Sequence, residues 1–439
     1  MTTDPLNRLA AWQLVQALAR RELRAEDLMR ACLDRVAERE GTVHAFAHLD
    51  PDAALAQARA LDAGALRGPL HGLPLGVKDL LDTADMPTGY GSPIYAGQRP
   101  AADAAAVALC KEAGAVVAGK TVTTEFAYFH PGPTANPHNP AHTPGGSSSG
   151  SAAAVADHML PLALGTQTAG SIIRPAAYCG VVGFKPSWGR VPRAGVKSLS
   201  ETLDTVGGFA RSVRDVALLG AVLLGDARLA ALAHDPDHAA TNEAASRALR
   251  IGMCRTPQWA QADPDTQAAW SAAAAALAPQ AAALAEVALP DSLGDLIDLQ
   301  KQVMAFETAR ALSHERVRHR DRLSERLRTL LDEGLAIPGA EHTARLIRRA
   351  QARHSVGALF EQWDVLLAPS ATGEAPAGLG ATGDPVFCRT WTLLGLPCVH
   401  LPFTRGQRGL PVGLQLIGRW GHDHQLLQAA HWVHQRLTG

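Results

Sequence analysis

Hydrophobic residues follow a helical period in several parts of the chain. Near the N-terminus Met29, Cys32, Leu33 and Val36 recur at intervals of three and four residues, so they share one face of a helix. The first forty residues are therefore expected to be mainly helical. The same reasoning predicts further helices over 102–114, 212–225, 265–284, most of 295–363, and 423–436.

Short uninterrupted apolar runs, bounded by glycine or proline, alternate with these helices. Such runs are typical of strands that are buried on both faces of a sheet. They lie at 72–82, 115–118, 159–165, 249–254, 364–371, 397–403 and 412–418, and residues 43–49 alternate as in a half-buried strand. Strands that alternate with helices predict an α/β layered fold. Because no repeat and no long linker divides the 439 residues, we expect a single domain.

Composition narrows the function classes. The formal net charge is −1, whereas binding to nucleic acid or to anionic membranes needs a basic excess. Six cysteines are scattered without a C-x-x-C pair, which argues against a zinc ribbon or a disulfide framework. No apolar run reaches the roughly 18 residues of a spanning helix, and the N-terminal stretch has no signal-peptide pattern. We therefore expect a cytoplasmic protein without nucleic-acid or membrane partners.

Two other patterns suggest sites but lack the context that those sites need. GAVVAGKT (114–121) has the letters of a phosphate-binding loop, but its four loop positions are apolar and the residues after it disfavour a helix, so we expect a strand. His130, His138 and His142 are candidate metal ligands. Prolines at 137, 140 and 144 oppose the helix that would align them. We expect neither a metal nor a cofactor.

A glycine–serine tract, HTPGGSSSGSAAAVA (142–156), is the first candidate for catalysis. Its composition favours a linker, yet it lies between a proline-rich loop and an apolar segment rather than between two domains. A serine nucleophile needs a base, and lysine can serve when burial lowers its pKa. Lys78 lies in the apolar run 72–82. The alternative for Lys78 is a strand-end residue whose amine reaches solvent.

A turn of small residues follows the predicted strand 159–165. Thr168, Ala169, Gly170 and Ser171 carry little side-chain bulk. Several backbone N–H groups of such a turn can point at one atom, as an oxyanion hole requires. Ser171 is therefore a second candidate nucleophile.

Together, these segments resemble the amidase signature family. The resemblance rests on GLPLGVKD around Lys78, GKT and TEF within 119–126, PGGSSSGSAAAVA (144–156), GTQTAGSIIRPAAYCGVVGFKPS (165–187) and GLPVGLQLIG (409–418). The spacings, 69 residues from Lys78 to Ser147 and 24 from Ser147 to Ser171, are similar to those of the family.

The resemblance implies a fold and a division of the chain. The fold would be a mixed central β-sheet covered by helices on both sides. The single domain would comprise an N-terminal helical region (1–65), a signature core with the catalytic residues (66–225), a mainly helical substrate-side region (226–363), and C-terminal strands with a last helix (364–439).

The resemblance also implies a catalytic triad. Ser171 would be the nucleophile, Ser147 would relay the proton from a non-proline cis peptide bond, and Lys78 would be the base. The backbone N–H groups of Thr168, Ala169, Gly170 and Ser171 would form the oxyanion hole. Residues near the serines would bind the substrate, and the candidates are Tyr128, Phe129, Ser148, Met304 and Trp391.

The expected activity is hydrolysis of a C–N amide bond through a serine acyl-enzyme. Carbamates and esters share this chemistry and stay open as small-molecule substrates. The alternative is the glutaminase subunit of a tRNA-dependent amidotransferase, which would act in a complex. A homodimer also stays open.

The chain departs from the family pattern around the nucleophile. Gln167 and Ile173 occupy positions where the family usually has Asp and Arg, and Arg174 follows one place later. Ala169 also stands where glycine is common. Because residues 173 and 174 point about 100° apart on a helical turn, we expect that Arg174 does not replace the missing partner of position 167.

Overall fold

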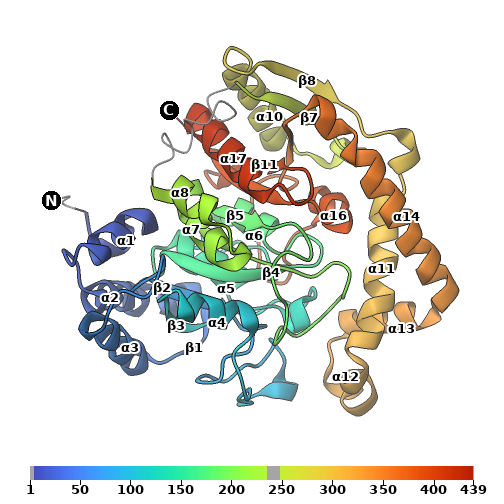
Figure 1. The fold of residues 1–439 in the computed structure, drawn as a ribbon. Coiled ribbons are helices and arrows are strands. Elements are labelled where there is room, and N and C mark those ends of the chain that lie inside the picture. Colours follow the sequence, from blue (N-terminus) through green and yellow to red (C-terminus); the bar gives the residue numbers. More distant parts are fainter. Residues whose placement is uncertain (1–3, 235–247, 439) are drawn as a thin grey trace.

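One eleven-stranded mixed sheet runs through the residues that the computed structural model describes, 4–234 and 248–438 (Figure 1). Its order is β1-β3-β2-β4-β6-β5-β10-β11-β9-β7-β8. The strands are β1 (Phe46–Leu49), β2 (Pro74–Lys78), β3 (Val116–Thr121), β4 (Leu162–Gln167), β5 (Val182–Lys185), β6 (Thr205–Ala210), β7 (Arg250–Cys254), β8 (Ala283–Val287), β9 (Val365–Pro369), β10 (Cys398–Arg405) and β11 (Pro411–Ile417). β2 is parallel to β3 and β4, and β7 is parallel to β8 and β9. The other neighbouring pairs are antiparallel.

Helices cover both faces of this sheet. α5 (Ser149–Ala156) and α6 (Ile173–Cys179) lie on one face, and α7 (Val213–Leu224) lies on the other. A Cβ at Gly207 would meet Ile172, just before α6, whereas a Cβ at Gly208 would meet Leu219 of α7. Successive strand residues point to opposite faces, so the two helices lie on opposite sides. The expected mixed sheet with helices on both sides is confirmed.

The remaining helices surround this core. At the N-terminal end are α1 (Ala11–Ala19), α2 (Ala25–Val43), α3 (Pro51–Ala63) and α4 (Ala105–Glu112). The later helices are α8 (Ala227–His234), α10 (Pro264–Leu277), α11 (Leu296–Ala311), α12 (Ser313–Arg318), α13 (Glu325–Ala336), α14 (Gly339–Gly357), α15 (Leu359–Gln362), α16 (Val386–Leu393) and α17 (Asp423–Thr438). Figure 1 shows α11 and α14 side by side at the edge of the molecule. None of the described helices is long and apolar enough to cross a membrane.

Two predicted elements have different bounds in the structure. The helix expected over 265–284 ends at Leu277, and β8 forms at Ala283–Val287. Its sequence ALAEV has little intrinsic strand preference, so pairing with β7 at the sheet edge decides its conformation. The strand expected over 43–49 begins only at Phe46, because α2 continues to Val43 and ends at His44 with a positive φ of 51°.

The parallel strands place the candidate residues. Lys78 is the last residue of β2, and Gln167 is the last residue of its neighbour β4. The carboxyl ends of parallel strands meet at the same edge of a sheet. The turn 168–171 therefore begins at the edge where the Lys78 side chain ends.

Candidate active site

Lys78 carries its amine into the protein interior. The side chain is fully buried, and Nζ lies 2.7 Å from Ser147 Oγ and 2.7 Å from Thr166 Oγ1. Burial holds the pKa of Lys78 well below its usual value, although the charge of Asp204 opposes this shift. Because both contacts are neutral hydroxyls, a neutral amine fits this position and can accept a proton.

Lys120 is a second buried lysine, and its contacts indicate a structural role. It lies in β3, and its Nζ donates to the carbonyl of Leu81 at 2.8 Å and lies 3.3 Å from a carboxylate oxygen of Asp79. GAVVAGKT is therefore part of a strand rather than a phosphate-binding loop, as expected. Lys120 faces a carboxylate, whereas Lys78 faces a serine.

The candidate histidines lie outside this site. His138 Nε2 is 2.9 Å from the backbone carbonyl of Cys179. Within residues 4–234 and 248–438, no group of three or more His, Cys, Asp or Glu side chains could hold a metal ion.

The glycine–serine tract forms a tight loop that leads into α5. The peptide bond between Gly146 and Ser147 is cis, as the resemblance implied. Gly145 has a φ of +81°, and a Cβ there would lie 2.9 Å from Cα of Pro175, so the loop needs glycine at this position. Arg174 Nη2 donates to the carbonyl of Gly146 at 2.6 Å, which fixes the peptide that precedes Ser147.

The turn 168–171 has its carbonyl groups held from outside. Gln300 Nε2 donates to the carbonyl of Thr168 at 3.0 Å, and Thr392 Oγ1 donates to the carbonyl of Ala169 at 2.7 Å. The carbonyl of Gly170 accepts from the N–H of Arg174 at 2.9 Å, at the start of α6.

These contacts orient the N–H groups of the same turn. In a trans peptide the N–H points opposite to the carbonyl of the preceding residue. The N–H groups of Ala169, Gly170 and Ser171 therefore point away from Gln300, Thr392 and α6, and they donate to no other group in the described parts of the chain. The N–H of Thr168 belongs to the peptide that joins Gln167, the last residue of β4, to the turn.

Two further side chains hold the ends of this turn. Thr168 Oγ1 donates to Asp204 Oδ1 at 2.6 Å. Gln167 Oε1 accepts from the N–H groups of Ile172 at 2.8 Å and Ile173 at 3.0 Å, and its Nε2 donates to Thr392 Oγ1 at 2.8 Å. A neutral amide thus satisfies the first turn of α6 where the family usually has a carboxylate.

Arg174 does not reach Gln167. Its guanidinium donates to the carbonyls of Gly383 and Gly146 and, at 3.1 Å, to the hydroxyl of Thr382. The structure thus agrees with the expectation that Arg174 does not replace the missing partner of position 167. Arg174 instead holds the serine loop.

A small cavity brings the candidate residues together. It surrounds about 290 Å³ of space and is lined by Ala127, Tyr128, Phe129, Ser147, Thr168, Ala169, Ser171, Arg174, Leu199, Met304 and Thr382. Both candidate serines face the same space, and the turn 168–171 forms part of its wall. Tyr128, Phe129 and Met304, three of the residues expected to bind the substrate, line this cavity.

The structure places Ser148 and Trp391 elsewhere, which corrects their expected role as substrate contacts. Ser148 is fully buried, and its Oγ donates to the carbonyl of Thr166 at 3.2 Å, so it ties the serine loop to β4. Trp391 is also fully buried and packs in the hydrophobic core from α16. Neither lines the cavity.

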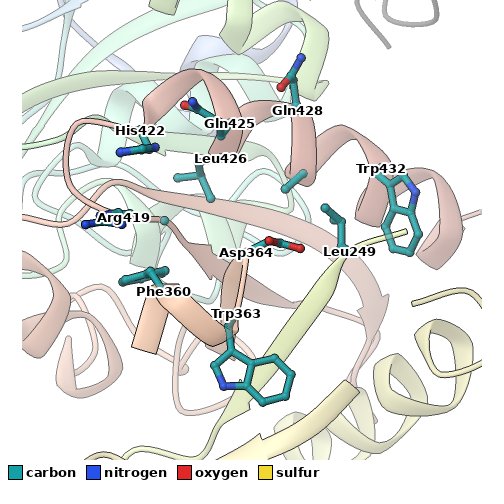
Figure 2. Close-up of a pocket in the computed structure, with 12 residues that line it drawn as sticks. Leu249, Phe360, Trp363, Asp364, Arg419, His422, Gln425, Leu426, Gln428 and Trp432 are labelled. Atoms are coloured by element: carbon teal, nitrogen blue, oxygen red, sulfur yellow. The ribbon is translucent and has the colours of Figure 1, made fainter. Parts of the chain in front are cut away.

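A larger hollow lies at the other end of the sheet (Figure 2). It surrounds about 940 Å³ between β7, α15 and α17, with Trp363, Asp364, His422 and Trp432 among its walls. None of the described residues that line it is Ser, Thr, Cys or Lys. It therefore offers no hydroxyl, thiol or amine nucleophile.

Several contacts of the site were not expected from the sequence. The lysine or the turn is held by Thr166, Asp204, Gln300 and Thr392, and Gln300 is in turn held by Arg389. Gln300, Arg389 and Thr392 lie more than a hundred residues after the turn. Of these residues, only Thr166 could have been predicted to lie near Lys78. It lies near the end of β4, which is parallel to the strand of Lys78.

Comparisons of the sequence with known proteins identify a family. The family model described as Amidase matches residues 27–427. The A-type subunit of the glutamyl-tRNA(Gln) amidotransferase of Roseiflexus castenholzii is 36% identical over 99% of this chain and 96% of its own length. The putative amidase AmiD of Mycobacterium tuberculosis is 35% identical over 99% and 95%.

A solved structure shows the same likeness in three dimensions. The peptide amidase from Stenotrophomonas maltophilia superposes with a TM-score of 0.83, at 31% identity, over 99% of this chain and 98% of that one. The similarity to these proteins, in sequence and in fold, extends over almost the whole length of this chain. This chain therefore belongs to the amidase signature family and is a hydrolase of the carbon–nitrogen bonds of amides.

Proposed function

We propose that the chain is a metal-independent serine amidase in which Ser171 is the nucleophile, Ser147 the proton relay and Lys78 the base. The observation that supports this most strongly is the 2.7 Å contact between Lys78 Nζ and Ser147 Oγ, with Ser147 on the same small cavity as Ser171. The hydroxyl of Ser147 thus lies between a buried amine and the space that a substrate would enter.

The acylation step follows from these positions. Ser171 Oγ attacks the amide carbon while its proton passes to Ser147 Oγ, whose own proton passes to the neutral amine of Lys78. The developing oxyanion accepts hydrogen bonds from N–H groups of the turn 168–171, whose carbonyls are held by Gln300 and Thr392. Lys78 then returns the proton through Ser147 to the leaving nitrogen, which departs as ammonia or an amine.

Deacylation reverses the same proton path. A water molecule attacks the ester carbon of the acyl-enzyme and gives one proton through Ser147 to Lys78. Collapse of the second tetrahedral intermediate releases the acid and returns that proton to Ser171 Oγ. Every proton taken by Lys78 is therefore returned in the same half-reaction.

A second candidate function has its own support. Relatives named as subunits of glutamyl-tRNA(Gln) amidotransferase are as similar to this chain as the putative amidases are. In that case the same triad would hydrolyse glutamine, and the released ammonia would be used by the amidotransferase complex. We favour the stand-alone amidase because it needs only the triad and the turn of this chain, whereas the amidotransferase role also needs a partner protein.

The purified chain alone distinguishes these functions. We expect it to release ammonia from small amides at a rate that is proportional to enzyme concentration, without added protein or metal, and in the presence of a chelator. Size-exclusion chromatography gives the assembly state of the active fraction. If the chain hydrolyses no amide other than glutamine, and does so only after a partner protein is added, the role in an amidotransferase complex is favoured instead.

The pH dependence of the rate reports on the base. Because burial lowers the pKa of Lys78, kcat/KM is expected to rise with pH through that depressed value and to remain high on the alkaline side. The measurement is kcat/KM from pH 5 to 10 in buffers of constant ionic strength. A rate that increases only near the ordinary lysine pKa, at roughly 10, would mean that Lys78 is not the base.

A further inference from the structure

The side chain of Gln167 connects the end of β4 to two helices. Its Oε1 accepts from the N–H groups of Ile172 at 2.8 Å and Ile173 at 3.0 Å, at the start of α6. Its Nε2 donates to Thr392 Oγ1 of α16 at 2.8 Å. Gln167 is fully buried, so solvent does not compete for these contacts. Both ends of the amide group are therefore held by the protein.

The two backbone N–H groups decide which way the Gln167 amide points. An N–H group needs an acceptor, so the amide oxygen must face α6 and the amide NH₂ group must face Thr392. The NH₂ group can only donate, and it therefore uses Thr392 Oγ1 as its acceptor. The hydroxyl proton of Thr392 must then point to a different oxygen.

The hydroxyl of Thr392 has two carbonyls within reach. Its Oγ1 lies 2.7 Å from the carbonyl oxygen of Ala169 in the turn 168–171, and 3.0 Å from that of Cys388, one helical turn earlier in α16. The carbonyl of Ala169 is the nearer acceptor. Because this carbonyl shares a peptide with the N–H of Gly170, the hydroxyl proton also fixes the direction of that N–H.

We infer that Gln167 is a positioning residue for the oxyanion hole, and that it acts by setting the direction in which the hydroxyl of Thr392 donates. The inference rests on the proposed function, because it concerns the N–H groups that stabilise the oxyanion in that mechanism. An ionised carboxylate of the same length could only accept. It would take the hydroxyl proton of Thr392 and leave the carbonyl of Ala169 without this donor.

Gln167→Glu tests this direction, since it replaces the amide with a carboxyl of nearly the same shape. At pH 8 we expect kcat to fall by roughly 10- to 100-fold with little change in KM, as for the loss of an oxyanion-hole contact. A protonated carboxyl has an O–H that can again donate to Thr392. The ratio of kcat of the variant to kcat of the parent should therefore rise as the pH falls from 9 to 5. Circular dichroism gives the folded fraction at each pH.

Other titrating groups do not produce this change in the ratio, because they are present in both proteins. β2 and β6 pair with β4, and α6 and α16 contact the Gln167 side chain. The charged or titratable groups of these elements toward this end of β4 are Lys78, Asp204, Arg174, Cys388 and Arg389. None of these five bonds to the side chain of Gln167. Burial without a cation raises the pKa of the new carboxyl, and the N–H donors of α6 lower it.

The Thr392→Val background shows whether Gln167 acts through Thr392. No hydroxyl remains there to be redirected, so adding Gln167→Glu should lower kcat by less than about threefold, and the ratio should no longer rise at low pH. Gln415→Glu is the matched control. Gln415 is a buried glutamine of β11 that donates to the carbonyls of Pro369 and Phe387 and has no contact with the turn. Its ratio to the parent should not depend on pH.

The outcomes separate this inference from the proposed function. The positioning role is wrong, and the serine mechanism stands, if Gln167→Glu keeps the kcat of the parent at pH 8. The same holds if the ratio is constant from pH 5 to 9, or if the loss multiplies with that of Thr392→Val. Absence of a fluorophosphonate adduct on Ser171 of the parent would overturn the mechanism itself.

Gln167→Met keeps the inference testable if Gln167→Glu does not fold. It removes the amide donor, so the hydroxyl proton of Thr392 is no longer directed to Ala169, and kcat should fall by roughly 3- to 10-fold. This loss should be absent in the Thr392→Val background. An equal loss in both backgrounds would mean that Gln167 does not act through Thr392.

Discussion

Ser171→Ala is expected to lower kcat for amide hydrolysis by at least about 10⁴-fold, because it removes the atom that forms the acyl-enzyme. Lys78→Met and Ser147→Ala should each lower kcat by several orders of magnitude, since both carry the proton between Ser171 and the buried amine. The measurement is ammonia release at saturating substrate by the parent and the three variants.

The double variant Lys78→Met, Ser147→Ala tests whether these residues act together. Residues that share one proton path have non-additive effects, so the double variant should be little worse than the poorer single variant. Ser149→Ala is the matched control: Ser149 is a buried serine of the same tract whose Oγ donates to the carbonyl of Val122 at 3.3 Å. Multiplied losses in the double variant would mean that Lys78 and Ser147 act independently.

Thr392→Val is expected to lower kcat by roughly 10- to 100-fold with little change in KM. The substitution keeps the shape of the side chain but removes the hydroxyl that holds the carbonyl of Ala169 and accepts from Gln167 Nε2. The turn 168–171 then loses one of its supports, and its N–H groups stabilise the oxyanion less well. The unfolding free energy should also fall by about 1–3 kcal/mol, because two buried polar groups lose their partner.

A second threonine of α16 provides the control. Thr390 is also buried but has no side-chain hydrogen bond to the turn, so Thr390→Val should change kcat far less than Thr392→Val does. Steady-state kinetics and denaturant unfolding of both variants give the comparison. An equal loss of kcat in the two variants would mean that α16 acts through its packing and not through the contact with Ala169.

The sequence made the strands that carry the site predictable. The apolar runs around Lys78 and before Gln167 become β2 and β4, because strands buried on both faces read as continuous apolar segments. The expectation that Gly146–Ser147 is a cis peptide, which the structure contains, depended on the family resemblance. Composition alone favoured a linker there.

The supports of the site could not be predicted in the same way. Gln300 and Thr392 lie on α11 and α16, more than a hundred residues after the turn that they hold, and their segments read only as helices. Contacts of this kind depend on how helices pack, which a local pattern does not contain. Trp391 shows the same limit, since its place in the core rather than at the substrate is set by which side of α16 faces the turn.

Covalent labelling tests the assignment of Ser171 most directly. The folded chain is treated with a fluorophosphonate, which forms a stable phosphonyl ester with an activated serine as fluoride leaves, and peptide fragmentation in a mass spectrometer locates the adduct. We predict one adduct, on Ser171, in the parent and in Ser149→Ala, and none in Ser171→Ala. An adduct on Ser147 or on any other serine of the parent, or a labelled Ser171→Ala variant, would contradict the assignment of Ser171 as the nucleophile.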